Sequence, residues 1–147
     1  MLENRIPPPI VTMLFAAAMW FMASPDTASP GRTAMAIGVF LLAGCFGFPA
    51  FRAFRRSGTT IDPVRIERAS SLVTGGIYRV SRNPMYVALA LLLAAWAIWL
   101  GGAWVWLGPP ALVLWLDRLQ IRPEERVMAA RFGQEYEEYQ RKVRRWI

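Results

Sequence analysis

The apolar block at residues 85–116 constrains the fold more than any other feature of this sequence. It contains no charged side chain, and it is too long for one bilayer-spanning helix, which needs about 20 residues. Gly101 and Gly102 divide it into two arms of similar length. We therefore expect a tight helical hairpin with arms at about 85–100 and 103–121.

The second arm of this hairpin reaches its length only with residues 117–121, whose polar side chains can extend toward the membrane surface. Pro109 and Pro110 fall inside this arm, and we expect them to bend it. The bend is either a harmless kink or an opening through which an amphiphilic ligand enters sideways.

Two further apolar stretches precede the hairpin, at about 8–23 and 33–51. The second is long enough to cross a hydrocarbon core of roughly 30 Å. A signal peptide is the alternative for the first stretch, but its basic region is limited to Arg5 and no clear A-x-A site follows. We expect one all-α integral membrane domain over 1–147, with four transmembrane helices and cytoplasmic surface helices.

The composition agrees with a membrane protein. Hydrophobic residues make up 55% of the chain, and the formal net charge is +7. That charge suits nucleic acid or the anionic inner face of a bilayer, but no nucleic-acid-binding motif accompanies it. Cys45, the lone cysteine, excludes an intramolecular disulfide. Histidine is absent, which excludes a histidine base and most zinc sites, so we expect neither a metal nor a nucleic-acid partner.

The positive charges set the expected orientation. Segments 52–84 and 122–147 carry nearly all the arginines, whereas the other two connections carry only Arg32. By the positive-inside rule, both of these segments and both termini are cytoplasmic. We expect a multi-pass protein of a bacterial inner membrane, in contact with membrane lipids.

The stretch GGIYRVSRNPMY, residues 75–86, is too polar for the mouth of a plain membrane anchor. Folding the hairpin brings this stretch beside the end of the second arm. The polar residues that meet there are Tyr78, Arg79, Arg82, Asn83, Tyr86, Asp117, Arg118, Arg122, Glu124 and Glu125. Carboxylates beside a bilayer are costly unless they are paired. The cluster is therefore either an Arg–Glu network that pins the hairpin to its cap or a ligand site.

The residues after the second arm predict two more helices. Pro123 followed by two glutamates indicates a helix start, and Gly133 indicates its end. Beyond that glycine, Tyr136, Tyr139 and Val143 share one face at helical spacing. This pattern predicts an amphipathic surface helix whose aromatic side chains face lipid or the bundle.

The motifs in this half of the chain carry a family resemblance. The order G-x-Y-R-x-x-R-N-P-x-Y, a hairpin, an E-E pair and F-G-x-E-Y-x-x-Y-x-x-x-V-R resembles the isoprenylcysteine carboxyl methyltransferase family and its bacterial and phospholipid methyltransferase relatives. The match runs from about Leu72 to Arg145. It implies a membrane methyltransferase that uses S-adenosyl-L-methionine and acts on a lipid-like or prenylated acceptor. The chain contains no G-x-G-x-x-G of the soluble type.

The resemblance also implies residue roles. The cofactor-binding residues would be Ser70, Ser71, Leu72, Val73, Tyr78, Asn83, Pro84, Met85, Tyr86 and Glu124. The family more often has histidine where Asn83 stands, and an amide cannot titrate. The family's acceptor-binding arginine falls on Gln120 here, so either Arg118 or Arg122 takes that role or the acceptor differs. These two arginines and Glu125 are the expected catalytic residues.

The acceptor decides what the site must do. A carboxylate, the favoured acceptor, needs only orientation by arginine, whereas an amine or hydroxyl must lose a proton. Glu125, Asp117 or a tyrosine are the candidate bases, and a thiol acceptor also stays open. Two alternatives remain: a reductase of related architecture, and a non-enzymatic membrane protein whose basic cap binds lipid or a partner.

Overall fold

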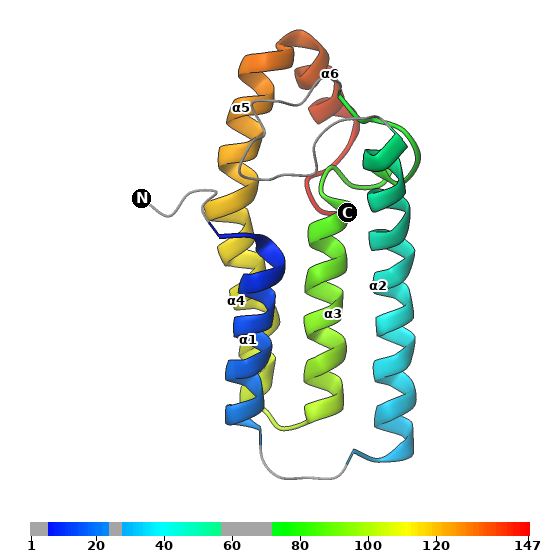
Figure 1. Ribbon diagram of the computed structural model, residues 1–147, viewed down its shortest axis with the longest axis vertical. Helices are drawn as coiled ribbons and strands as arrows, with labels where there is room; N and C mark the ends of the chain where they lie inside the picture. Colours follow the sequence, from blue (N-terminus) through cyan, green and yellow to red (C-terminus); the bar gives the residue numbers. More distant parts are fainter. Residues whose placement is uncertain (1–5, 24–27, 57–71) are drawn as a thin grey trace.

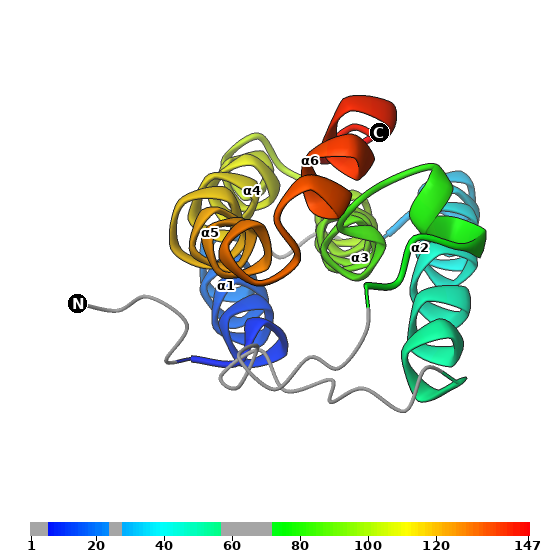
Figure 2. The same ribbon diagram turned by 90° about the horizontal axis from the view of Figure 1, so that it is seen from above.

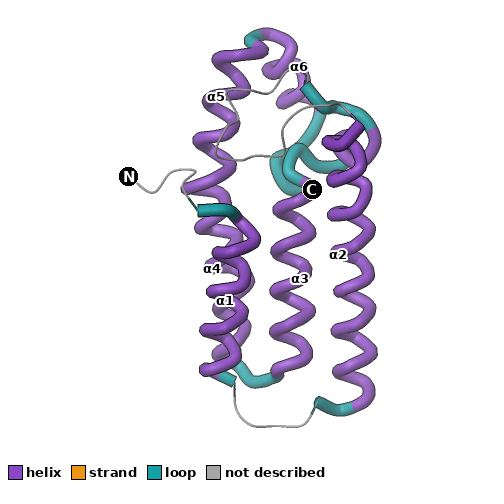
Figure 3. Tube along the Cα trace, viewed as in Figure 1, coloured by secondary structure: helices purple, strands orange, loops and turns teal. Residues whose placement is uncertain are grey.

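The computed structural model describes residues 6–23, 28–56 and 72–147. All regular structure in these ranges is helical, which confirms the predicted all-α class (Figure 3). The first four α-helices are α1 (Pro8–Met22), α2 (Pro30–Arg56), α3 (Pro84–Leu100) and α4 (Gly108–Leu116). Figures 1 and 2 both place α3 in the middle, with α1 and α4 on one side and α2 on the other.

The turn expected at Gly101 and Gly102 is present. Both glycines have positive φ angles, 73° and 86°, in the left-handed region that residues with a Cβ disfavour. A Cβ at Gly101 would also lie 2.5 Å from Nη1 of Arg32, at the start of α2. A short 3₁₀ helix (Trp104–Leu107) then leads into α4, so the two arms turn back at the end of the bundle remote from most charges.

Pro109 and Pro110, which we expected to bend the second arm, lie where a 3₁₀ helix gives way to α4. Helix α4 begins at Gly108, so both prolines occupy its first turn rather than the interior of a longer helix. The backbone N–H groups of a first turn have no partner within the helix, and proline loses little by lacking one there.

A helix, α5 (Arg122–Phe132), begins beside Pro123 as expected, but it follows α4 without a break instead of starting a separate segment. Figure 1 shows the two helices in one line. Between them lies a π-helical turn, η4 (Asp117–Ile121), in which the N–H of Arg122 bonds the carbonyl of Asp117. Pro123 has no N–H and its ring crowds the preceding turn. A locally widened helix accommodates both effects.

Small residues set the packing of α2 on α3. Ala36, Ala43 and Ala50 of α2 are buried at seven-residue spacing, which places them along one side of the helix. A Cβ at Gly47 would lie 3.2 Å from the Cβ of Ala88 in α3. Such small side chains let two helix backbones approach closely, as they do in membrane bundles.

Helix α5 ends at Gly133 (φ 50°), as expected, and α6 (Gln134–Lys142) follows. An apolar cluster lies under α6. Tyr136, Tyr139 and Val143 are buried there with Ala50 of α2. The aromatic face of α6 therefore points toward the bundle, one of the two predicted outcomes.

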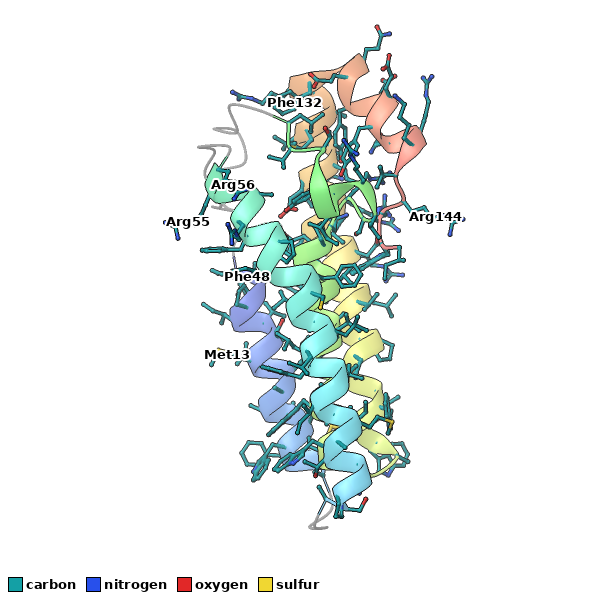
Figure 4. The ribbon with its side chains drawn as sticks, turned by 90° about the vertical axis from the view of Figure 1, so that its right-hand side faces the viewer. Met13, Phe48, Arg55, Arg56, Phe132 and Arg144 are labelled. Carbon is teal, nitrogen blue, oxygen red and sulfur yellow. The ribbon has the colours of Figure 1, made fainter. Side chains whose placement is uncertain are left out.

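The outer faces of α1 and α2 are apolar. Among the described residues, one helical stretch, Pro30–Ala53, is long and apolar enough to cross a membrane, while Pro8–Met22 and Pro84–Leu100 are shorter apolar helices. Figure 4 shows Met13 and Phe48 projecting away from the bundle. Both side chains are more than half exposed.

Candidate functional site

The candidate site lies where the mouth of α3, the α4–α5 junction and the C-terminal residues meet. Before α3, a 3₁₀ helix, η2 (Gly76–Arg79), buries Tyr78 in the cluster under α6. The hydroxyl of Tyr139 donates to the carbonyl oxygen of Tyr78 at 2.7 Å. The polar stretch at residues 75–86 is thus folded against α6 at the end of the bundle.

An ion-pair network joins these segments, and its centre is Glu125. Arg82 Nη2 lies 2.6 Å from Glu125 Oε1, and Arg145 Nη2 lies 2.6 Å from Glu125 Oε2. Arg145 also reaches Asp117 at 2.9 Å. The Arg82 and Glu125 side chains are each only 11% exposed. The network that the sequence offered as one alternative is therefore confirmed.

The C-terminal residues are held to the mouth of α3 by further hydrogen bonds. The backbone N–H of Arg82 donates to the carbonyl of Arg144 at 3.0 Å. The side-chain Nδ2 of Asn83 donates to the carbonyl of Arg145 at 3.0 Å, and the hydroxyl of Ser81 donates to the same oxygen. One of the two N–H donors of the Asn83 amide is therefore bonded to the protein itself.

Glu124, one residue before the network centre, has a different environment. Within the part of the chain that the structure describes, its hydrogen-bond partner is Tyr86 of α3, whose hydroxyl donates to Oε1 at 2.5 Å. Desolvation by burial raises the pKa of Glu124 to about 7; the bond from Tyr86 opposes the rise and the charge of Glu125 adds to it. The hairpin thus joins a half-buried carboxylate to a phenol from the facing arm.

The candidate bases, Glu125, Asp117 and the tyrosines, differ from Glu124 in their hydrogen-bond partners or in their pKa. Arginines occupy the carboxylate oxygens of both Glu125 and Asp117. Desolvation by burial raises the pKa of Tyr78, and it raises that of Tyr136 to about 12. Neither tyrosine ionises near neutral pH. Glu124, whose pKa burial raises to about 7, changes charge close to neutral pH.

The structure places the other predicted site residues as follows. Arg118 is exposed, and Arg122 is 57% exposed and bonds Asp117 at 2.8 Å. Pro84 is buried at the start of α3. Leu72, Val73 and Met85 pack against the cluster under α6. Ser70 and Ser71 lie outside the described residues.

Sequence reasoning gave no role to Arg145 or Gln120. Arg145 closes the network by pairing with Asp117 and Glu125. Because carboxylates beside a bilayer need a partner, these two acidic residues were the signal that a further arginine would reach them. Gln120 is fully buried in the π-turn η4. An amide one helical turn after Leu116, in an otherwise apolar register, was its signal.

An apolar groove lies on another side of the bundle, between α1, α2 and α3. Its volume is about 430 Å³, and its walls include Phe40, Leu92, Trp96 and Trp99. The residues that line it come from α1, α2 and α3 rather than from α4, where the sequence allowed either a harmless kink or an opening.

Comparisons with known proteins identify the family. The family model for phospholipid methyltransferases matches residues 31–135. Two rice proteins (Oryza sativa subsp. indica and japonica) described as probable protein-S-isoprenylcysteine O-methyltransferases are 36% identical over 95 residues, which cover 60% of this chain and 46% of theirs. The chain thus spans about half the length of these relatives.

A shorter relative matches a smaller part of the chain. A Haemophilus influenzae protein described as uncharacterized is 44% identical over 63 residues, 43% of this chain and the whole of that protein. No solved structure matches the chain.

Proposed function

Because this chain belongs to the phospholipid methyltransferase family, we propose that it transfers a methyl group from S-adenosyl-L-methionine to an amphiphilic acceptor at the membrane. The observation that carries this proposal is the contact between Tyr86 and Glu124. Both residues lie within the matched region, and they come from the two arms of the hairpin.

The environment of Glu124 suits a cationic ligand. Desolvation penalises its charged form, which is why its pKa rises to about 7. A positive group placed against the carboxylate would favour the charged form and relieve that penalty. S-Adenosyl-L-methionine carries an ammonium group and a sulfonium, and it supplies the methyl group on the positively charged sulfur. The residues present therefore fit this donor.

The chain's own residues have defined tasks in such a reaction. Glu124 accepts hydrogen bonds from the donor, and Tyr86 fixes the carboxylate by bonding one of its oxygens. The network around Glu125 holds the mouth of α3 against α5, so the two arms keep their spacing. Apolar side chains of α3 and α4 exclude water, which favours a displacement that neutralises charge.

We propose that four segments cross the membrane: α1, α2, α3 and the second arm of the hairpin. Large apolar side chains are exposed along the first two helices, where lipid would cover them. Exposed Trp104 and Trp106 mark the hairpin turn, where indoles suit a membrane interface. Figure 4 places Arg55, Arg56 and Arg144 toward the other end, which we assign to the cytoplasm together with both termini.

The acceptor is proposed to carry a hydrocarbon chain. The groove between α1, α2 and α3 is large enough for part of a lipid tail, since ligand pockets commonly measure about 300–1,000 Å³. Its walls are almost wholly apolar. A lipid or a prenylated molecule is therefore a better acceptor than a small polar metabolite.

The direct test is transfer of a tritiated methyl group. Purified protein in detergent is incubated with labelled S-adenosyl-L-methionine and a bacterial lipid extract, and the organic phase is counted and separated by chromatography. We expect label in a lipid species, and its loss with Glu124→Gln. Absence of label, together with binding of a nicotinamide cofactor in a parallel titration, would favour the reductase alternative and contradict the proposal.

A further inference from the structure

The last two turns of α2 carry three exposed arginines, Arg52, Arg55 and Arg56. The helix contains no Asp or Glu that could pair with them. Other arginines at this end of the molecule bond carboxylates, as Arg145 does with Glu125. None of the ion pairs that join described residues includes the three arginines of α2. Three positive charges are thus gathered on one helix end without an acid on the same helix.

Two of these guanidinium groups lie over aromatic rings. Cζ of Arg52 is 5.6 Å from the centre of the Phe48 ring, and Cζ of Arg55 is 5.9 Å from that of Phe51. Each ring belongs to the preceding helical turn, so the positive groups are drawn back toward the apolar part of α2. A long basic side chain at the end of a span can instead extend away from hydrocarbon into water. The cation–π contacts thus keep two charges beside apolar surface, where an anion lowers the cost of holding them.

The surface along α2 before these arginines is apolar and exposed. Phe48 is 63% exposed, and Leu41, two helical turns before it, is 62% exposed. A Cβ added at Gly44, between them in the sequence, would meet no atom within 4 Å. Figure 4 shows Arg55 and Arg56 beyond Phe48 on the same side of the molecule. This face is therefore apolar along the helix and positive at its end, which complements a phospholipid with its hydrocarbon chain and its phosphate.

We propose that this end of α2 binds the headgroup of an anionic phospholipid, while a hydrocarbon chain of the same lipid lies along Phe48 and Leu41. The inference goes beyond the proposed methyl transfer and rests only on the proposal that α2 crosses the membrane. Guanidinium groups present paired N–H donors that match phosphate oxygens. Arg52 and Arg55 are three residues apart and are neighbours on the helix surface, so one phosphate can contact both.

The charge of this surface selects an anionic headgroup over phosphatidylethanolamine. The ammonium of phosphatidylethanolamine would lie among three positive charges, with no carboxylate on α2 to receive it. The rings of Phe48 and Phe51, which could otherwise attract an ammonium, already lie under guanidinium groups. Phosphatidylglycerol carries only hydroxyl groups beyond its phosphate and avoids this repulsion. An acidic protein segment would match the charge, but it would leave the apolar face uncovered.

The test is a lipid titration of the purified protein in detergent, followed by native mass spectrometry. The probes are dioleoylphosphatidylglycerol, dioleoylphosphatidylethanolamine and the soluble compound sn-glycerol 3-phosphate. For the wild type we expect a Kd about tenfold lower for phosphatidylglycerol than for phosphatidylethanolamine, and no binding of glycerol phosphate. The double variant Arg52→Gln/Arg55→Gln should raise the Kd for phosphatidylglycerol about tenfold. The matched control, Arg141→Gln/Arg144→Gln, removes two exposed arginines from the same end of the molecule and should stay within about twofold.

A second variant tests the aromatic contacts. Phe48→Leu/Phe51→Leu keeps the charges and the apolar surface but removes the rings, and we expect the Kd for phosphatidylglycerol to rise about threefold. An unchanged Kd in this variant, or equal losses in the two arginine double variants, would leave only general attraction between charges and would overturn the proposed site. Equal affinity of the wild type for the two phospholipids would overturn the choice of headgroup. Binding of glycerol phosphate as tight as that of the lipid would overturn the lipid itself.

Melting curves complete the test. Because the side chains of Arg52 and Arg55 are exposed, their double variant should melt at the wild-type temperature in lipid-free detergent. Added phosphatidylglycerol should then raise the melting temperature of the wild type but not that of the variant. An equal rise in both proteins would contradict the proposal. No methyl donor is present in these experiments, so a protein that fails to bind S-adenosyl-L-methionine can still pass them, and the two proposals fail separately.

Discussion

Two neighbouring glutamates of α5 have opposite surroundings. Glu125 contacts Arg82 and Arg145 through both of its carboxylate oxygens. Glu124 contacts the hydroxyl of Tyr86, and desolvation raises its pKa to about 7. The comparison teaches that an E-E pair, read as one motif in the sequence, contains one carboxylate that is paired with two arginines and one, bonded to a tyrosine, for which we propose ligand binding.

The geometry of the helix explains the difference. Successive residues of a helix point about 100° apart, so adjacent glutamates meet different neighbours. The π-turn η4 sets which side each faces, because it adds a residue before α5 begins. Glu124 consequently meets α3, whereas Glu125 meets the residues before α3 and the C-terminal segment.

The largest expected effect is the loss of stability in Glu125→Ala. This change leaves two arginines without their shared carboxylate, and breaking a buried ion pair from one side costs about 3–5 kcal/mol. We expect a large fall in the melting temperature of the protein in detergent, measured by the fluorescence of its tryptophans. Glu137→Ala is the control, because its pair with Arg141 is 3.8 Å long and exposed. Equal stability of the two variants would break the comparison.

The second effect is a pH dependence of stability that comes from Glu124. Its pKa is raised from 4.5 to about 7 in the folded state, so the folded protein holds this proton where the unfolded chain has lost it. Stability should therefore fall as pH rises from about 4.5 to 7 and then level off, by roughly 3 kcal/mol at most. Glu124→Gln should remove this component. Identical pH profiles for wild type and variant would contradict the assigned environment.

A smaller effect should show whether Asn83 serves the fold, through its bond to Arg145, or binds the cofactor, as the resemblance implies. Its Nδ2 donates to the carbonyl of Arg145, so Asn83→Ala should destabilise the protein by about 1 kcal/mol. We expect its affinity for S-adenosyl-L-methionine to change less than that of Glu124→Gln. If calorimetry instead shows the larger loss for Asn83→Ala, the resemblance-based role of Asn83 in cofactor binding gains support and Glu124 loses its priority.

Much of the fold was predictable from local signals. The glycine pair located the hairpin turn, and the spacing of Tyr136, Tyr139 and Val143 gave the apolar face of α6, though not whether lipid or the bundle covers it. The hairpin also predicted the cluster in which Tyr86 and Glu124 lie, though not their bond. These features depend on backbone freedom and on the helical period, both of which are written in short stretches of sequence.

The division of labour inside the site was not predictable in the same way. Pro123 suggested a helix start, but its missing N–H is accommodated by the π-turn, and that turn decides which glutamate faces which partner. Arg145 reaches Glu125 from the far end of the chain. Such partners depend on how α6 docks, and no local pattern specifies that. Gln120 is fully buried in this π-turn.

The most direct test of the central claim is a calorimetric titration of S-adenosyl-L-methionine into the wild type and Glu124→Gln, at pH 5.5 and pH 7. We predict binding that strengthens toward pH 7 in the wild type, because the ligand favours ionised Glu124. In the variant we expect affinity at least tenfold weaker at pH 7 and independent of pH over this range. Equal affinities of the two proteins, or the absence of binding by the wild type, would contradict the account.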